Sequence, residues 1–171
     1  MAMVCPVATE ESDAASVILL TEKALTPQDA RRLVGLHAGE PVRYRILVPA
    51  DVERNLLADV LDHLSLLEFK EALEAVRGQE DPTPMEAGEA LEASLTALSG
   101  ESVAVTGAVV QGDPVVALQA AIDADPGVRE VVVVTEPHAV EDTFHRDWAS
   151  RAREKLGVPV LHVYAGSSWL G

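Results

Sequence analysis

Residues 107–137 read GAVVQGDPVVALQAAIDADPGVREVVVVTEP, and this segment decides the fold. Its first residues are apolar and typical of a strand. Asp113 then suits the N-cap of a helix and Pro114 its first position, and apolar residues recur at helical spacing after them. The turn sequence DPG precedes VVVV, a run typical of a buried strand. A strand, a helix and a strand in this order predict a parallel pair joined by a crossover helix.

The same alternation continues on both sides of this segment. The apolar runs predict strands at residues 16–20, 42–51, 101–113, 129–134 and 158–166. Helical spacing and turn residues predict helices at residues 26–39, about 56–76, 85–98, from 114 onward, and about 137–156. Five strands with helices between them indicate an α/β fold. We expect a three-layer arrangement, with a parallel sheet covered by helices on both faces.

The composition fits a single domain with an aliphatic core. Hydrophobic residues make up 48% of the 171 residues, and aromatic residues only 4%. We expect the domain at residues 16–166, between a flexible arm at 1–15 and a tail at 167–171. Cys5 is the only cysteine, which excludes a disulfide within the chain and a cysteine-based zinc site.

The charge of the chain excludes two classes of partner. The formal net charge is −15, and so acidic a surface repels nucleic acid and anionic membranes. The first residues do not form a secretory signal, and no apolar run approaches the length that spans a bilayer. The sequence therefore predicts a cytoplasmic protein.

Three motifs follow one another in the second half of the chain. They are Gly112-Asp113-Pro114 at the end of a strand, VVVV at residues 131–134, and Pro159-Val160-Leu161 in the last strand. This pattern resembles the universal stress protein (UspA-like) family, whose Rossmann-like fold is shared with the adenine nucleotide alpha hydrolases. The resemblance implies the strand order 3-2-1-4-5. It also implies a homodimer that forms through the last strand.

Two features of the nucleotide-binding members of that family are absent. Those members carry an acidic residue and small residues directly after the first strand, where this chain has Thr21-Glu22-Lys23. They also carry a glycine-rich loop after the fourth strand, where this chain reads TEPHAVED from residue 135. No glycine occurs between Gly127 and Gly157. The sequence thus predicts a divergent member without the usual phosphate-binding loop.

The replacement of that loop has a physical consequence. Glycine lets backbone amides approach a phosphate, and Pro137 removes one amide outright. Glu136, Glu141 and Asp142 add negative charge at the same place. A like-charge pair about 5 Å apart costs roughly 3 kcal/mol at an effective dielectric of about 20. We therefore expect no nucleotide cofactor of the usual type, and the sequence predicts no other cofactor.

A ligand crevice is expected where the first and fourth strands end side by side. His138 near two glutamates could act there as a general base, or the acidic groups could form a rim without chemistry. The second reading is the more common one for such clusters. The residues expected to line the crevice are Thr21, Glu22, Pro49, Ala50, Gly112, Asp113, Thr135, Glu136 and His138.

A metal site is a further hypothesis for the same region. His138, Asp142 and His145 are spaced so that they share one face of the predicted helix. Two imidazoles and a carboxylate can hold a divalent metal. Acidic residues also favour a helix N-terminus without any metal, so the same pattern is consistent with an ordinary solvated first turn.

The last strand is expected to lie at an edge of the sheet. Val160, His162 and Tyr164 alternate along it, and we expect them at a dimer edge. Alternatively, the apolar tail with Trp169 and Leu170 packs against its own domain and protects this edge.

Three functions remain open from the sequence. The first is a non-enzymatic dimeric module with a stress or regulatory role, and the sequence favours it. The second is a protein that binds an adenine nucleotide or another small ligand in an altered crevice. The third is a metal-dependent or hydrolase-like enzyme that uses His138 and nearby carboxylates. A phosphoacceptor receiver domain fits less well, because no lysine follows the last strand.

Overall fold

The chain folds around one parallel sheet of five strands. The computed structural model describes residues 14–50, 84–112, 114–135 and 154–166. The strands are β1 (Ala15–Thr21), β2 (Val42–Pro49), β3 (Ala104–Val110), β4 (Val128–Thr135) and β5 (Val160–Tyr164). Their order is β3-β2-β1-β4-β5, and every neighbouring pair is parallel. The predicted fold class and strand order are therefore confirmed.

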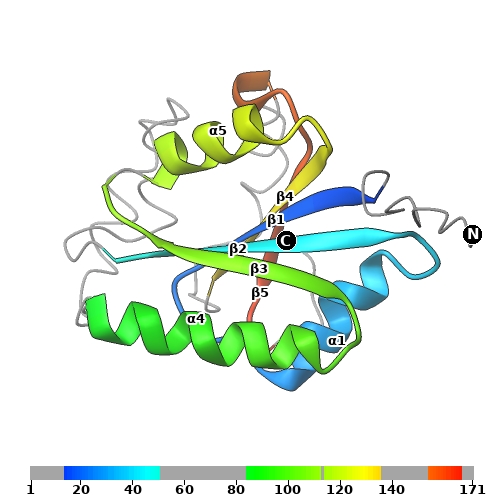
Figure 1. Cartoon of the computed structure of the whole chain (residues 1–171), viewed down its shortest axis with the longest axis vertical. Coiled ribbons are helices and arrows are strands. Elements are labelled where there is room, and N and C mark those ends of the chain that lie inside the picture. Colours follow the sequence, from blue (N-terminus) through cyan, green and yellow to red (C-terminus); the bar gives the residue numbers. More distant parts are fainter. Residues whose placement is uncertain (1–13, 51–83, 113, 136–153, 167–171) are drawn as a thin grey trace, which may run out of the picture.

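Helices cover both faces of this sheet. Figure 1 shows α1 (Pro27–Leu36) and α4 (Pro84–Ser99) on one face, and α5 (Pro114–Ala124) on the other. The face on which each helix lies follows from the direction in which its connection crosses the sheet. Because crossovers between parallel strands are right-handed, the connections that run from β1 towards β3 and the one that returns to β4 lie on opposite faces.

Helix α1 begins where the sequence predicts it. The hydroxyl of Thr26 accepts from the Asp29 amide at 3.2 Å, and the Asp29 carboxylate accepts from the Thr26 amide at 3.1 Å. This is a capping box, which satisfies donors that the first turn leaves without partners. The helix ends at Leu36, and Gly39 follows in the left-handed region at φ +87°.

The strand boundaries differ from the sequence predictions by a few residues. The third strand was expected at residues 101–113 but spans only Ala104–Val110, because Gly112 already turns the chain with φ +79°. The first and fourth strands are longer than expected by one residue at each end. The helices predicted at about 56–76 and 137–156 lie outside the described residues, except for the last few residues of the second.

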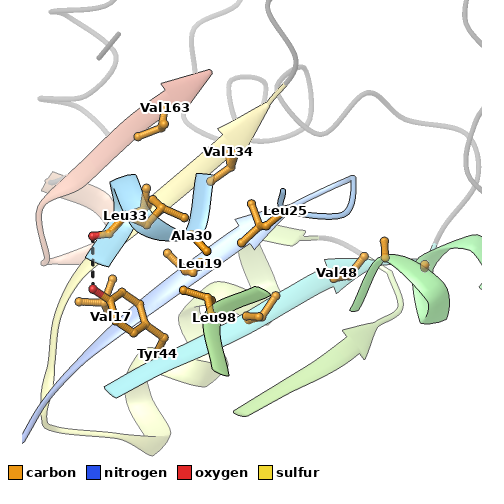
Figure 2. Close-up of a cluster of buried hydrophobic side chains, with 14 of the residues drawn as sticks. Val17, Leu19, Leu25, Ala30, Leu33, Tyr44, Val48, Leu98, Val134 and Val163 are labelled. Atoms are coloured by element: carbon orange, nitrogen blue, oxygen red, sulfur yellow. Dashed lines mark hydrogen bonds between the residues drawn. The ribbon is translucent and has the colours of Figure 1, made fainter. Parts of the chain in front are cut away.

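The core consists of two apolar layers, one on each face of the sheet. Side chains of β1 and β4 alternate between the layers, as strand geometry requires. The α5 layer holds Ile18, Leu20, Leu118, Val131 and Val133. The opposite layer, shown in Figure 2, holds Val17, Leu19, Leu33, Leu98, Val134 and Val163.

Helix α4 packs unusually close to β3 at Gly107. A Cβ atom on Gly107 would lie 2.5 Å from Leu91 Cδ1 and 3.1 Å from the Ile46 carbonyl oxygen. A Cβ atom here would displace the end of the Leu91 side chain and crowd the Ile46 carbonyl, so packing rather than a turn favours glycine at this position. Nothing in the local sequence pattern distinguishes this glycine from the others.

A charged network lies at the amino-terminal ends of the strands, next to the end of α5. The Ser16 hydroxyl donates to Asp125 over 2.6 Å, and Arg43 Nε donates to Ser16 Oγ over 2.6 Å. Arg43 Nη2 also reaches Asp125 at 3.1 Å. The hydrogen bond from Ser16 is the main cause that holds the pKa of Asp125 below its ordinary value. The turn after α5 is thereby tied to the first residues of β1 and β2.

A second network lies at the same ends of the strands, on the face of the sheet that α1 covers. His37 Nδ1 lies 2.9 Å from the Tyr44 hydroxyl, and His37 Nε2 lies 2.6 Å from Glu130 Oε1. The Tyr44 hydroxyl also donates to the Leu33 carbonyl over 3.3 Å, the dashed line in Figure 2. Burial and the Glu130 charge raise the pKa of Tyr44 to about 12. The end of α1 is therefore joined to both β2 and β4.

Candidate functional site

The candidate site lies at the carboxyl-terminal ends of the parallel strands. β1 and β4 are neighbours there, with Thr21 opposite Val134. The chain proceeds from β1 to β2 and from β4 to β5, in opposite directions along the sheet. This arrangement is the switch point at which ligands of open α/β folds bind.

Thr21 lies at the carboxyl-terminal end of β1, but its side chain hydrogen-bonds within its own loop. Thr21 is 2% exposed, and its hydroxyl donates to the Lys23 carbonyl over 2.8 Å. The loop that follows is anchored on α4, because the Leu25 amide donates to Ser94 Oγ over 2.9 Å. Ser94 is fully buried and in turn donates to a carbonyl of its own helix. No motif in the sequence indicates a role for this serine.

The predicted residues at the ends of β2 and β3 are mainly backbone features. Pro49 and Ala50 are buried, and the Ala50 amide donates to the Val110 carbonyl over 2.8 Å. Gly112 is exposed and holds the turn that leaves β3. These residues shape this end of the sheet and contribute no ionisable group to it.

Thr135 ends β4 and contacts a histidine of the next strand. Thr135 Oγ1 lies 2.7 Å from His162 Nε2, and the two residues are 3% and 2% exposed. The His162 ring also packs edge-on against Tyr164, with centroids 4.6 Å apart. The pair is therefore a buried polar contact between β4 and β5, which sequence analysis did not connect.

Thr21 and Thr135 were expected together in the crevice, but their side chains face opposite layers. Thr21 follows Val17 and Leu19 on the α1 face, whereas Thr135 follows Val131 and Val133 on the α5 face. Adjacent strands in this register place the two residues on different sides of the sheet. Both lie at the carboxyl-terminal ends of neighbouring strands, and a crevice that includes both stays a prediction.

The three residues predicted at a dimer edge lie on β5, the last strand of the sheet order. Val160 and Tyr164 are half-buried, whereas the His162 side chain is buried within its own chain. The His162 ring therefore contacts β4 of its own chain, and the dimer edge stays a prediction.

Helix α1 holds the end of β5. Asp29 accepts from the Gly166 amide over 2.8 Å, and Arg32 Nη1 donates to the Tyr164 carbonyl over 3.2 Å. Burial acts to raise the pKa of Asp29, but hydrogen bonds from Thr26 and Gly166 and the Arg32 charge bring it below its ordinary value. The spacing of Thr26 and Asp29 is a capping signature, so this much was readable from the sequence. The contacts with β5 were not.

Glu22 directly follows Thr21 in the loop after β1 and is half-buried. The remaining predicted site residues lie outside the described part of the chain. They are Asp113, Glu136, His138, Asp142 and His145, so the general base and the metal site remain predictions. Within the described residues, no group of three or more histidine, cysteine, aspartate or glutamate side chains could hold a metal ion. No helix among these residues is long and apolar enough to cross a membrane.

Comparison with known proteins supports the fold. No family model matches the chain, and no curated protein matches it. Among solved structures, the hypothetical protein MJ0577 matches with a TM-score of 0.51 and 18% identity over 91% of this chain and 99% of that one.

Universal stress proteins are among the other matching structures. One from Arabidopsis thaliana (At3g01520), solved with AMP bound, has a TM-score of 0.48 and 9% identity over 89% of this chain and 93% of its own. UspA from Lactobacillus plantarum has a TM-score of 0.42 and 15% identity over 88% of this chain and 98% of its own. The strand order that the resemblance implied is the one observed, and the match to MJ0577 is a likeness of fold.

Proposed function

We propose that this chain, with a fold shared with universal stress proteins, is a non-catalytic module that works as a homodimer in the cytoplasm. Its role is regulatory, and it does not bind ATP in the manner of the nucleotide-binding members. The observation that carries the proposal is the chemistry after β4. The strand ends at Thr135, and the sequence has no glycine from there to Gly157.

The chemistry of this segment disfavours a phosphate. Bare glycine amides at a helix start are the usual partners of phosphate groups, and this sequence has Glu136 and Pro137 instead. The polar side chain at the end of β4, Thr135, is already within hydrogen-bond distance of His162. A phosphate here would meet negative charge and an occupied hydroxyl.

The position of β5 supports the dimer. β5 is the last strand of the order, and only β4 pairs with it among the described residues. An edge strand presents backbone groups that pair readily with another strand. A second copy offers the same strand, so two copies can satisfy each other through an isologous contact.

A thermal-shift titration tests the nucleotide part of the proposal. We expect the melting temperature to stay constant when ATP or AMP, each with and without Mg²⁺, is added at millimolar concentration. A ligand that binds only the folded state stabilises it, by about 2.7 kcal/mol when its concentration is a hundred times its Kd. This stabilisation raises the melting temperature. A dose-dependent rise with ATP would reject this part of the proposal.

A second candidate function is the binding of another small ligand. The observation that favours it is the adjacency of Thr21 and Val134, which forms the switch point independently of any phosphate loop. Native mass spectrometry of the purified protein tests it. A retained non-phosphate compound would favour this second function, whereas a retained nucleotide would overturn the first proposal.

A further inference from the structure

The backbone groups at the end of β5 point in two alternating directions. The Pro159 carbonyl and the Ala165 amide both face β4, the latter donating to the Thr135 carbonyl over 2.7 Å. Since alternate residues of a strand face opposite neighbours, the Tyr164 carbonyl points to the outer side of the sheet. This is the side on which another strand would add. The Gly166 amide lies in the turn after β5 and donates to Asp29 rather than to β4.

Two side chains of α1 hydrogen-bond with these two groups. Arg32 donates to the Tyr164 carbonyl over 3.2 Å, and Asp29 accepts from the Gly166 amide over 2.8 Å. Asp29 is 4% exposed, and its second oxygen is held by the amide and hydroxyl of Thr26 at 3.1 and 2.7 Å. The carboxylate is therefore fixed by the first turn of the helix.

The chemistry of the two side chains matches what a strand would provide. A neighbouring strand supplies one N–H donor to a carbonyl and one carbonyl acceptor to an amide. The Arg32 guanidinium and the Asp29 carboxylate supply the same donor and acceptor. Helix α1 thus takes the place of a partner strand at this end of β5.

We propose that Asp29 and Arg32 act as a stop for strand addition at β5, so that pairing with a second copy ends before the Tyr164 carbonyl. This inference rests on the proposed homodimer. Backbone hydrogen bonds alone specify register weakly, and an edge without such a stop permits slippage and extension. The stop therefore fixes where two copies align, and both residues are positioning residues.

Sedimentation equilibrium of Arg32→Ala tests the stop, with Arg31→Ala as the matched control. Arg31 is the adjacent, exposed arginine of the same helix, so both variants remove one positive charge. We expect Arg32→Ala to raise the association constant about tenfold or to form species larger than a dimer, because each copy regains a backbone acceptor. Arg31→Ala is expected to stay within about twofold of the wild type.

A second pair of variants separates the stop from helix capping. Asp29→Ala removes both the cap and the Gly166 contact, whereas Thr26→Ala removes the hydroxyl from the cap but keeps Asp29 on Gly166. Both are expected to lower the melting temperature. Only Asp29→Ala is expected to change association. A purely structural role would lower the melting temperatures without a change in association, which would overturn the inference.

The same data distinguish failure of the inference from failure of the dimer. A dimeric wild type with equal association of Arg32→Ala and Arg31→Ala overturns the stop and leaves the dimer standing. Monomers for the wild type and for all four variants at about 100 μM, a concentration at which micromolar association is visible, overturn both.

Discussion

The contact between Thr135 and His162 joins two residues that the sequence suggested for different roles. Thr135 was expected in a crevice and His162 at a dimer edge, 27 positions later. They meet because Val133 pairs with His162 and the strands run in parallel. A single sequence carries no signal for the register between two parallel strands, so the pair could not be predicted.

Replacement of Thr135 by valine should measure this contact. Thr135→Val removes the hydroxyl from a buried imidazole at nearly constant volume. We expect the free energy of unfolding to fall by about 1–3 kcal/mol, the usual cost of leaving a buried polar group without a partner. Urea denaturation at neutral pH is the measurement. Thr135→Ser keeps the hydroxyl and should lose less, and equal losses in both variants would argue against the hydrogen bond.

A single methyl group at Gly107 should be costly for a different reason. Gly107→Ala places a Cβ atom 2.5 Å from Leu91 Cδ1 and 3.1 Å from the Ile46 carbonyl oxygen, so the Leu91 side chain must shift and the β2 backbone is crowded. We expect a loss of about 1–3 kcal/mol in unfolding free energy. Gly88→Ala is the control, because nothing lies within 4 Å of its added Cβ and alanine favours a helix. A neutral Gly107→Ala variant would contradict the packing described.

Helices and strands were predictable where a local signal marks their ends. Thr26, Pro27 and Gly39 marked α1, and the observed helix begins at Pro27 and ends at Leu36. β3 was overestimated because the predicted span included residues 101–103 and 111–113, whereas pairing with β2 covers only Ala104–Val110 and Ser102 and Gly112 turn the chain with positive φ on either side. Pairing decides the length of a strand, and pairing is not local.

The capping aspartate of α1 should make stability depend on pH. The folded pKa of Asp29 lies below its ordinary value of 3.8, so its contribution is fully present above that pH. The contribution is lost as pH falls through 3.8 towards the folded pKa. We expect the unfolding free energy of the wild type to fall more steeply than that of Asp29→Asn between about pH 5 and pH 3. Urea titrations at several pH values test this, and parallel curves for the two proteins would refute it.

For the whole molecule, the alternation of strands and helices was sufficient to predict the layers. The strand order came from the resemblance to universal stress proteins and agrees with the observed sheet. The networks at the amino-terminal ends of the strands were not predictable, because Ser16 and Asp125 are 109 positions apart. Their residue types are common on surfaces, and only the folded topology brings them together.

The overall acidity should be visible in the salt dependence of stability. A net charge of −15 on 171 residues repels itself in the compact state. We expect the melting temperature at pH 7 to rise as NaCl increases from ~0.01 M to ~1 M, over which the Debye length falls from about 30 Å to about 3 Å. Calorimetry tests this. The rise should shrink near the sequence pI of about 4.6, and a fall with salt at pH 7 would contradict the prediction.

The central place of β1 has a consequence for synthesis of the chain. β1 pairs with β2 soon after both leave the ribosome, but its other neighbour is β4. At roughly 5–20 residues per second, residues 128–135 emerge about 5–20 seconds after β1. During that interval β1 carries the apolar run at residues 17–20 with one strand edge unpaired. An unpaired apolar strand edge is prone to aggregation, and here it stays open until translation reaches VVVV.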